Sequence, residues 1–176
     1  ARASDPPASE PPVSEPGANA LANGDFSAGL SGWTNESSLA ATASVAEVGG
    51  NPQAILQPTA EATARISQQV AVAGNTDYQL SGQIVSEEGA YGYFGVKGFD
   101  GKWSEVTAGD NVSGEYTVAF PTAADTEFVT VYAQAYRQQT GAIGLDAIRL
   151  VPAASEPPVT EPPVTEPPAT EPPASE

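Results

Sequence analysis

Residues 128–136, which read FVTVYAQAY, alternate between two kinds of side chain. Small apolar residues stand at every second position from Val129 to Ala135, and aromatic or polar residues stand between them. Successive side chains of a β-strand point to opposite faces of its sheet, so a period of two predicts a strand with one buried face. The apolar half of this segment is therefore assigned to a core and the other half to an outer face.

The same alternation recurs upstream in residues 78–85, YQLSGQIV, and in residues 91–99, YGYFGVKGF. No helical period of 3.6 persists for more than a turn, and Gly, Asn and Asp separate the apolar runs. These patterns favour an all-β, two-sheet antiparallel β-sandwich of the jelly-roll type. Its predicted strands are Ala40–Val48, Gln53–Pro58, Ala64–Val72, Thr76–Ser86, Tyr91–Phe99, Gly114–Pro121, Phe128–Arg137 and Ala142–Val151.

Both ends of the chain differ from this central part. From Ser155 the sequence repeats SEPPV, TEPPV, TEPPA and TEPPA, and a related SDPPA begins at Ser4. Paired prolines fix φ and remove hydrogen-bond donors, which favours an extended polyproline II chain. We therefore expect disordered Pro- and Glu-rich linkers at 1–17 and 153–176 around one module at 18–152. The linkers predict flanking catalytic or binding modules in a secreted parent chain; partner recruitment by the Pro-rich segments is the alternative.

Composition excludes several classes of function. The chain lacks cysteine, histidine and methionine, which removes thiolate and imidazole nucleophiles and zinc or copper sites. The ends carry eight acidic residues and Arg2, a net −7, so −9 of the total −16 belongs to the module. Such a surface repels nucleic acid and anionic membranes, so neither is an expected partner. No apolar run approaches the length of a membrane span, and we expect a monomer.

The outward positions of three predicted strands collect amides and tyrosines, whereas charged residues usually dominate a solvated sheet. Aromatic rings cover the C–H face of a sugar, and amide or hydroxyl groups meet its hydroxyls. This pattern favours a carbohydrate-binding sheet face, with the candidates Tyr91, Tyr93, Lys97, Tyr132, Gln134, Tyr136, Gln79 and Gln83. The alternative is that these tyrosines stabilise cross-strand pairs or fill a second layer under a loop. Trp103 follows the turn signal Asp100-Gly-Lys and is either a loop-borne sugar platform or a hydrophobic cap.

Residues 21–34, LANGDFSAGLSGWT, resemble the opening signature of the jelly-roll carbohydrate-binding modules of families 4, 9, 16 and 22. Related segments follow in the family's order at Ile66–Val70, Gly74–Gly82 and Ile143–Leu150, so that the resemblance covers the whole predicted module. It implies a non-catalytic module that targets an attached enzyme to a polysaccharide. Trp33 matches a position that is normally structural, and we assign it to the core.

The resemblance also implies one structural calcium ion, which in this family commonly ties the first strand to the last. On the matching positions Asp146 is the best ligand, with Asp25 or Asn23 contributing, and oxygen ligands suit this hard cation. Ser27 stands where many family members carry glutamate, which removes one carboxylate from the set. Without a metal, Asp25 would close an Asx turn and Asp146 would be an ordinary strand-end carboxylate.

The family implies β-1,4- or β-1,3-glucans, xylan, or marine polysaccharides such as galactans and alginate as ligands. The net charge favours a neutral β-glycan, because a polyuronate would be repelled unless Lys97, Arg65 and Arg137 cluster. We expect the glycan on the concave sheet face, and the loops at one end of the sandwich are the alternative.

Two other classes of function compete with this hypothesis. A glycosidase needs two carboxylates, and Glu87 and Glu88 lie together in a predicted turn. Adjacent turn residues point apart and stay solvated, and no carboxylate lies in an apolar alternation that would raise its pKa, so we do not expect catalysis. A calcium-stabilised structural or adhesion spacer is the second competitor, because such modules can keep the fold without a ligand.

Overall fold

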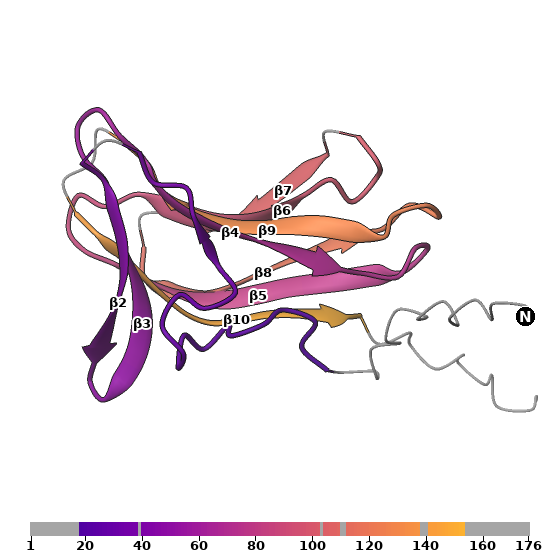
Figure 1. Cartoon of the computed structure of the whole chain (residues 1–176), viewed down its shortest axis with the longest axis horizontal. Coiled ribbons are helices and arrows are strands. Elements are labelled where there is room, and N and C mark those ends of the chain that lie inside the picture. The colour runs from indigo at the N-terminus through magenta and orange to yellow at the C-terminus, as the bar shows by residue number, and fades with distance from the viewer. Residues whose placement is uncertain (1–17, 39, 103, 110–111, 138–140, 154–176) are drawn as a thin grey trace, which may run out of the picture.

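The computed structural model describes residues 18–38, 40–102, 104–109, 112–137 and 141–153. These residues form two five-stranded antiparallel sheets that face each other as a sandwich (Figure 1). The predicted all-β sandwich is therefore confirmed. Trp103 and the predicted linkers, apart from Ala153, lie outside the described residues.

The chain crosses repeatedly between the two sheets. Sheet A has the order β1-β4-β9-β6-β7, with β1 (Thr34–Asn35), β4 (Ala64–Ala71), β9 (Phe128–Ala135), β6 (Gly92–Lys97) and β7 (Glu105–Ala108). Sheet B has the order β2-β3-β10-β5-β8, with β2 (Thr42–Val48), β3 (Asn51–Gln57), β10 (Ile143–Pro152), β5 (Asp77–Ser86) and β8 (Gly114–Pro121). Among the described strands, only the pairs β2–β3 and β6–β7 are consecutive strands of the same sheet. In Figure 1 the strands of sheet A lie above β8, β5 and β10.

Each of the eight predicted strands is present, with ends that differ from the prediction by no more than two residues. The sequence prediction missed β1 and β7, which lie at the two edges of sheet A. Both are short and none of their residues is buried, so they lack the apolar alternation by which the other strands were recognised.

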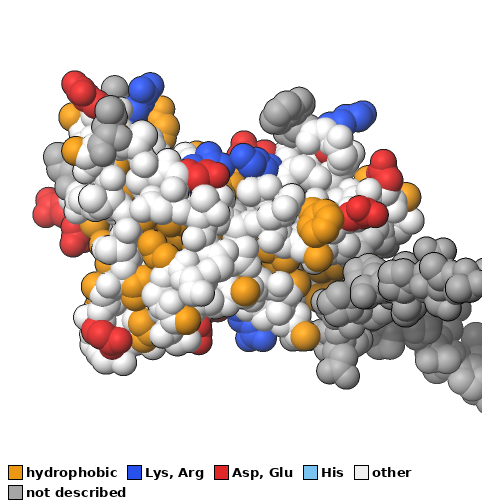
Figure 2. Space-filling view, viewed as in Figure 1, with side chains coloured by type: hydrophobic (Ala, Val, Ile, Leu, Met, Phe, Trp, Pro, Cys, Tyr) orange, Lys and Arg blue, Asp and Glu red, His pale blue; other side chains and the backbone are white. Residues whose placement is uncertain are grey.

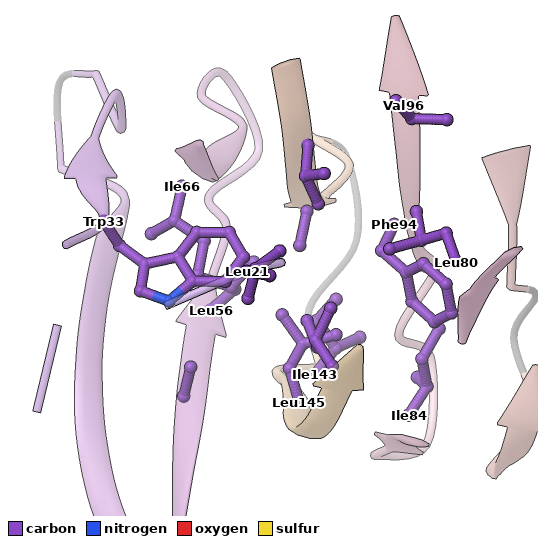
Figure 3. Packing of buried hydrophobic residues seen from close by; sticks show 14 of the residues in the cluster. Leu21, Trp33, Leu56, Ile66, Leu80, Ile84, Phe94, Val96, Ile143 and Leu145 are labelled. Atoms are coloured by element: carbon purple, nitrogen blue, oxygen red, sulfur yellow. The ribbon is translucent and has the colours of Figure 1, made fainter. Parts of the chain in front are cut away.

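The core lies between the sheets and consists of the inward halves of the alternating strands. Leu80 and Ile84 from β5 meet Phe94 from β6, and all three are fully buried (Figure 3). At the other end of the core, the indole of Trp33 lies against Leu21, Leu56 and Ile66 (Figure 3). Only 7% of Trp33 is exposed, which confirms its assignment to the core.

The segment that precedes β1 closes the sandwich against β10. Ala20 N donates to Leu150 O at 2.8 Å, and Ile148 N donates to Gly24 O at 2.9 Å. A Cβ atom at Gly24 would overlap Ile148 O, so this close approach requires glycine. Next to this contact β10 changes register between Asp146 and Arg149. The first and last parts of the module are thus joined by backbone hydrogen bonds.

Candidate functional site

Outward-facing side chains of sheet A form a polar and aromatic surface, which we call the tyrosine face. The strand register sets its rows: Arg65, Gln134 and Tyr93 lie opposite one another across β4, β9 and β6. The next row contains Ser67, Tyr132, Gly95 and Thr107, and the one after it contains Gln69, Thr130, Lys97 and Glu105. Figure 2 shows basic and acidic side chains next to one another along the upper edge of the molecule, on the side of sheet A.

Tyr132 occupies the centre of the tyrosine face but is buried by its neighbours, with 1% of its surface exposed. The guanidinium carbon of Arg65 lies 4.3 Å from the centre of its ring, and Lys97 Nζ lies 5.9 Å from it. Tyr93 packs edge-on against the same ring, with 6.2 Å between the ring centres. The predicted role of Tyr132 as a surface in contact with sugar is therefore not supported by its position: its ring supports the residues that cover it.

The hydroxyl of Tyr132 extends across β6 and donates to Glu105 Oε1 on β7 at 2.5 Å. This reach depends on Gly95, which lies opposite Tyr132 in the register. A Cβ atom at Gly95 would come within 3.0 Å of the hydroxyl oxygen and within 2.6 Å of Val106 O. Burial raises the pKa of Tyr132 well above its ordinary value, and the hydrogen bond to Glu105 and its negative charge raise it further.

A second network fixes the hydroxyl of Tyr93. Arg65 Nε lies 2.9 Å from Glu36 Oε2, an ion pair in which the N–H bond is not directed at that oxygen. Arg65 Nη1 donates to Gln134 Oε1 at 3.5 Å, and Gln134 Nε2 donates in turn to Tyr93 Oη. Gln134 is 8% exposed, so the structure places it as a support for Tyr93. Burial raises the pKa of Tyr93, and the charge of Glu105 adds to this effect.

A pocket of about 410 Å³ opens beside Tyr93 at one end of the tyrosine face. Its described lining is Tyr91, Tyr93, Glu105, Thr107, Gly109 and Tyr136. Tyr91 is 38% exposed and Tyr136 is 39% exposed, which leaves both rings available to a ligand. The rings of Tyr91 and Tyr93 are 6.0 Å apart and inclined at 62°. The structure thus brings three of the predicted tyrosines together around one opening.

Sequence reasoning missed the β7 side of this pocket. Glu105, Thr107 and Gly109 line it, but none of them was a candidate. The signal was weak because β7 has only four residues, although they do alternate between exposed and half-buried positions after the Asp100-Gly turn. That alternation, read together with the turn, could have identified the strand.

Gln79 and Gln83 were predicted to share one face with the tyrosines, and this was wrong. Both lie on β5 in sheet B, where Gln79 is opposite Ala119 and Gln83 is opposite Glu115. Their side chains are exposed on the far side of the sandwich. The alternation separates the inner and outer sides of each strand, but it does not say to which sheet a strand belongs. Trp103 lies outside the described residues.

The three residues suggested as calcium ligands already have partners within the protein. Asn23 Oδ1 accepts from Ala28 N at 3.0 Å, and its amide group donates to two carbonyl oxygens of the same loop. Asp25 Oδ1 accepts from Ser27 N at 3.3 Å and from Ser27 Oγ at 3.0 Å, which is the Asx turn considered as the alternative. These hydrogen bonds hold the pKa of Asp25 below its ordinary value.

Asp146 is 6% exposed and both of its oxygens accept hydrogen bonds, Oδ1 from Ala147 N and Oδ2 from Asn51 Nδ2. Within the described part of the chain no three acidic, histidine or cysteine side chains gather where they could hold a metal ion. The residues present therefore do not offer a set of free carboxylate ligands, and calcium remains a prediction.

Glu87, considered above as one of two adjacent carboxylates, has a structural partner. Its Oε2 accepts from Ala142 N at 2.9 Å and its backbone N–H donates to Ala142 O at 3.1 Å. These bonds join the turn after β5 to the start of β10. No helix in the described ranges is long and apolar enough to cross a membrane.

Comparison with known proteins gives one relative in sequence. No protein-family model matches the chain. Exochitinase 1 of Streptomyces olivaceoviridis is 32% identical to it over 132 residues, which make up 73% of this chain. The chain spans only about a fifth of the length of that exochitinase, 21%.

Several solved structures share the fold. The module TmCBM61, solved in complex with beta-1,4-galactotriose, superposes with a TM-score of 0.60 at 15% identity and covers 77% of this chain and 99% of its own. A family 16 carbohydrate-binding module gives 0.60 at 20% identity, over 76% and 99% of the two chains. The enzymatically active domain of tailspike protein 4 from bacteriophage CBA120 gives 0.62 at 14% identity, over 77% and 21%. The expected likeness to jelly-roll carbohydrate-binding modules is confirmed at the level of the fold.

Proposed function

We propose that this chain, which has the jelly-roll fold of carbohydrate-binding modules, is a non-catalytic module that binds a polysaccharide on the tyrosine face. The observation that carries the proposal is the pocket between Tyr91, Tyr93 and Tyr136. Exposed aromatic rings beside hydroxyl groups are what a sugar requires, since its C–H faces stack on rings and its hydroxyls need partners.

The two kinds of residue in this face have different roles. Tyr91 and Tyr136 supply exposed rings for stacking, and Thr107, which also lines the pocket, supplies a hydroxyl group for sugar hydroxyls. Tyr132 and Gln134 are buried and hold Tyr93 through ring packing and a hydrogen bond. Side chains that are already fixed lose little conformational freedom on binding, so this support favours affinity.

The charges of the face favour a glycan without acidic groups. Arg65 is engaged by Glu36, and Glu105 contributes a negative charge to the pocket wall. A polyuronate such as alginate would meet that carboxylate and a module of net charge −9. A β-glycan free of carboxylates is therefore the ligand class that we propose, and alginate is disfavoured.

The role in a larger protein follows from tethering. The relative, an exochitinase, is about five times as long as the matched region, and Pro- and Glu-rich segments flank the module here. A module that holds glycan raises the effective concentration of any enzyme linked to it at the same substrate. We propose a secreted parent chain with an attached polysaccharide-degrading domain.

The first test is affinity electrophoresis against laminarin, cellulose, xylan, mannan, agar and alginate. We expect retardation by at least one carboxylate-free glycan, and Tyr136→Ala should weaken binding about tenfold because it removes an exposed stacking ring. Gln83→Ala, a change on the outer side of sheet B, is the matched control and should bind as the wild type does.

Three results would contradict the proposal. If the chain binds none of the glycans in the panel, a structural spacer is favoured. Equal losses in Tyr136→Ala and Gln83→Ala would remove the site from the tyrosine face. Reproducible release of reducing sugar by the pure chain would show that the module is catalytic.

A further inference from the structure

The pocket of the tyrosine face has a distinctive charge. Among the described residues that line it, Glu105 alone is ionisable at neutral pH, and the rings of Tyr91, Tyr93 and Tyr136 form much of the remaining wall. The face of an aromatic ring is negative and attracts cations, most strongly where water is partly excluded. A carboxylate among three such rings provides a site for a positive group.

Glu105 is only partly engaged by the protein. Its Oε1 accepts from the hydroxyl of Tyr132, and no other described side chain hydrogen-bonds to the carboxylate. Lys97 lies opposite Glu105 in the register of β6 and β7 but forms no ion pair with it, and its ammonium group lies 5.9 Å from the ring centre of Tyr132. Within the described ranges the ion pair of this face is that of Arg65 with Glu36, away from the pocket lining.

No lysine or arginine is among the described residues that line the pocket, although Lys97 and Arg65 lie nearby against the ring of Tyr132. Tyr93 is a neutral hydroxyl at neutral pH, as tyrosines ordinarily are, and burial raises its pKa further. The module as a whole carries −9, which favours the approach of positively charged ligands.

We propose that this pocket, if the chain binds glycans as proposed above, prefers a sugar unit that carries a free ammonium group to the same unit with a neutral substituent. The ammonium group of a de-N-acetylated amino sugar would lie against the rings of Tyr91 and Tyr136 and face the carboxylate of Glu105. The ligand class is thus a β-glycan that contains free amino sugars.

Three hexasaccharides with the same β-1,4 backbone isolate this preference, because they differ only at C2 of each unit. They are the hexamers of glucose, of N-acetylglucosamine and of glucosamine, which carry a hydroxyl, an acetamide and an ammonium group. Isothermal titration calorimetry near pH 6 and at low salt should give roughly three- to tenfold tighter binding for glucosamine than for the neutral hexamers. Added salt should reduce this ratio.

Two variants distinguish the effect of the pocket carboxylate from the effect of the net charge of the module. Glu105→Gln removes the charge and keeps an oxygen for the hydroxyl of Tyr132, so the ratio of affinities should fall toward one. Glu115→Gln removes one charge from β8 in sheet B and is the matched control, for which the ratio should stay at the wild-type value. Tyr136→Leu removes one aromatic ring from the pocket and should also lower the ratio of affinities. Far-ultraviolet circular dichroism and thermal melts check that each variant is folded.

The outcomes distinguish this inference from the proposed function. A wild-type preference for glucosamine that Glu105→Gln removes and Glu115→Gln retains supports it. Equal affinities of the wild type for the three hexamers would overturn the inference, and so would an equal fall of the affinity ratio in Glu105→Gln and Glu115→Gln. Neither result would contradict the proposal that the chain binds glycans. If the wild type binds none of the hexamers and none of the polysaccharides of the panel, the proposed function fails, and this inference fails with it.

Discussion

Tyr132 connects three strands of sheet A through one side chain. Its backbone belongs to β9, its ring lies over Gly95 of β6, and its hydroxyl donates to Glu105 of β7. Arg65 covers the ring from the β4 side. Tyr93 of the pocket therefore packs against a tyrosine that is almost completely buried, and the hydroxyl of that tyrosine also donates to the carboxylate of the pocket.

The raised pKa of Tyr132 predicts a loss of stability at high pH. Above about pH 10 the unfolded chain loses the phenolic proton, whereas the folded chain keeps it, so the folded state then binds more protons. The free energy of unfolding should fall as pH rises, by up to ~1.4 kcal/mol per pH unit from this residue. Tyr132→Phe should flatten that fall, although at neutral pH it costs about 1 kcal/mol through the lost hydrogen bond.

Urea denaturation at several pH values between 8 and 11 measures how the free energy of unfolding changes with pH in the wild type and in Tyr132→Phe. Lysine titration contributes equally to both proteins, so it does not affect the difference between them. Tyr116→Phe is a control from sheet B, since the hydroxyl of Tyr116 is bonded to Val112 O in an exposed position. If the wild type and Tyr132→Phe lose stability in parallel, the hydroxyl of Tyr132 is not held as described.

At the scale of single residues, the sequence predicted which side chains point away from the core better than it predicted which side chains are exposed to solvent. Tyr132 and Gln134 do point away from the core, as the period of two requires, yet they are 1% and 8% exposed. Their burial results from long side chains on neighbouring strands, above all Arg65, whose conformation depends on Glu36 at a distant position in the chain. A local pattern contains no information on such contacts.

At the scale of elements, the pocket depends on the hairpin of β6 and β7. The prediction found β6 from its alternation and missed β7, so it found the tyrosines of the pocket and missed Glu105 and Thr107. The error with Gln79 and Gln83 has a related cause, because the pairing of strands into sheets is set by contacts between distant parts of the chain. Strand positions were thus predictable, and the assembly of one face from several strands was not.

Gly95→Ala tests the close contact between these two strands. The added methyl group would lie 2.6 Å from Val106 O, so the hairpin or the ring of Tyr132 must move. We expect a loss of about 1–3 kcal/mol in the free energy of unfolding, the usual cost of overpacking. Glycan affinity should fall as well, because the movement displaces Glu105.

Chemical denaturation gives the stability change, and Gly114→Ala on β8 is the matched control. There the new Cβ would meet only the ring of Tyr116, at 3.6 Å, so a change within about 0.5 kcal/mol is expected. A Gly95→Ala protein as stable as the control would show that β6 and β7 are farther apart than described.

At the scale of the whole molecule, the segment before β1 and the last strand close the sandwich together. In the family that the sequence resembles, a calcium ion commonly makes this connection. Here backbone hydrogen bonds from Ala20 and to Gly24 make it, and the carboxylate of Asp146 is engaged by Asn51. Hydrogen bonds within the protein thus join the segment before β1 to β10.

Calcium binding remains a proposal that a thermal melt can test. An ion that binds only the folded state stabilises it by about 2.7 kcal/mol at a hundred times its dissociation constant, so if calcium binds despite the engaged ligands, EDTA would lower the melting temperature by several degrees. Asp146→Asn should abolish that difference, whereas Asp77→Asn at the exposed start of β5 should retain it. Identical melting curves with calcium and with EDTA would contradict the proposal.

The hydrogen bond between Ala20 and Leu150 also determines how the module behaves mechanically. Because the polypeptide enters and leaves the sandwich at neighbouring points, as Figure 1 also shows, the folded body adds little to the end-to-end span of the chain that carries it. The sandwich therefore projects to one side of the chain that carries it. Tension along the chain would load the contact between the first segment and β10, and the tyrosine face, which is on the other sheet, would not carry that load.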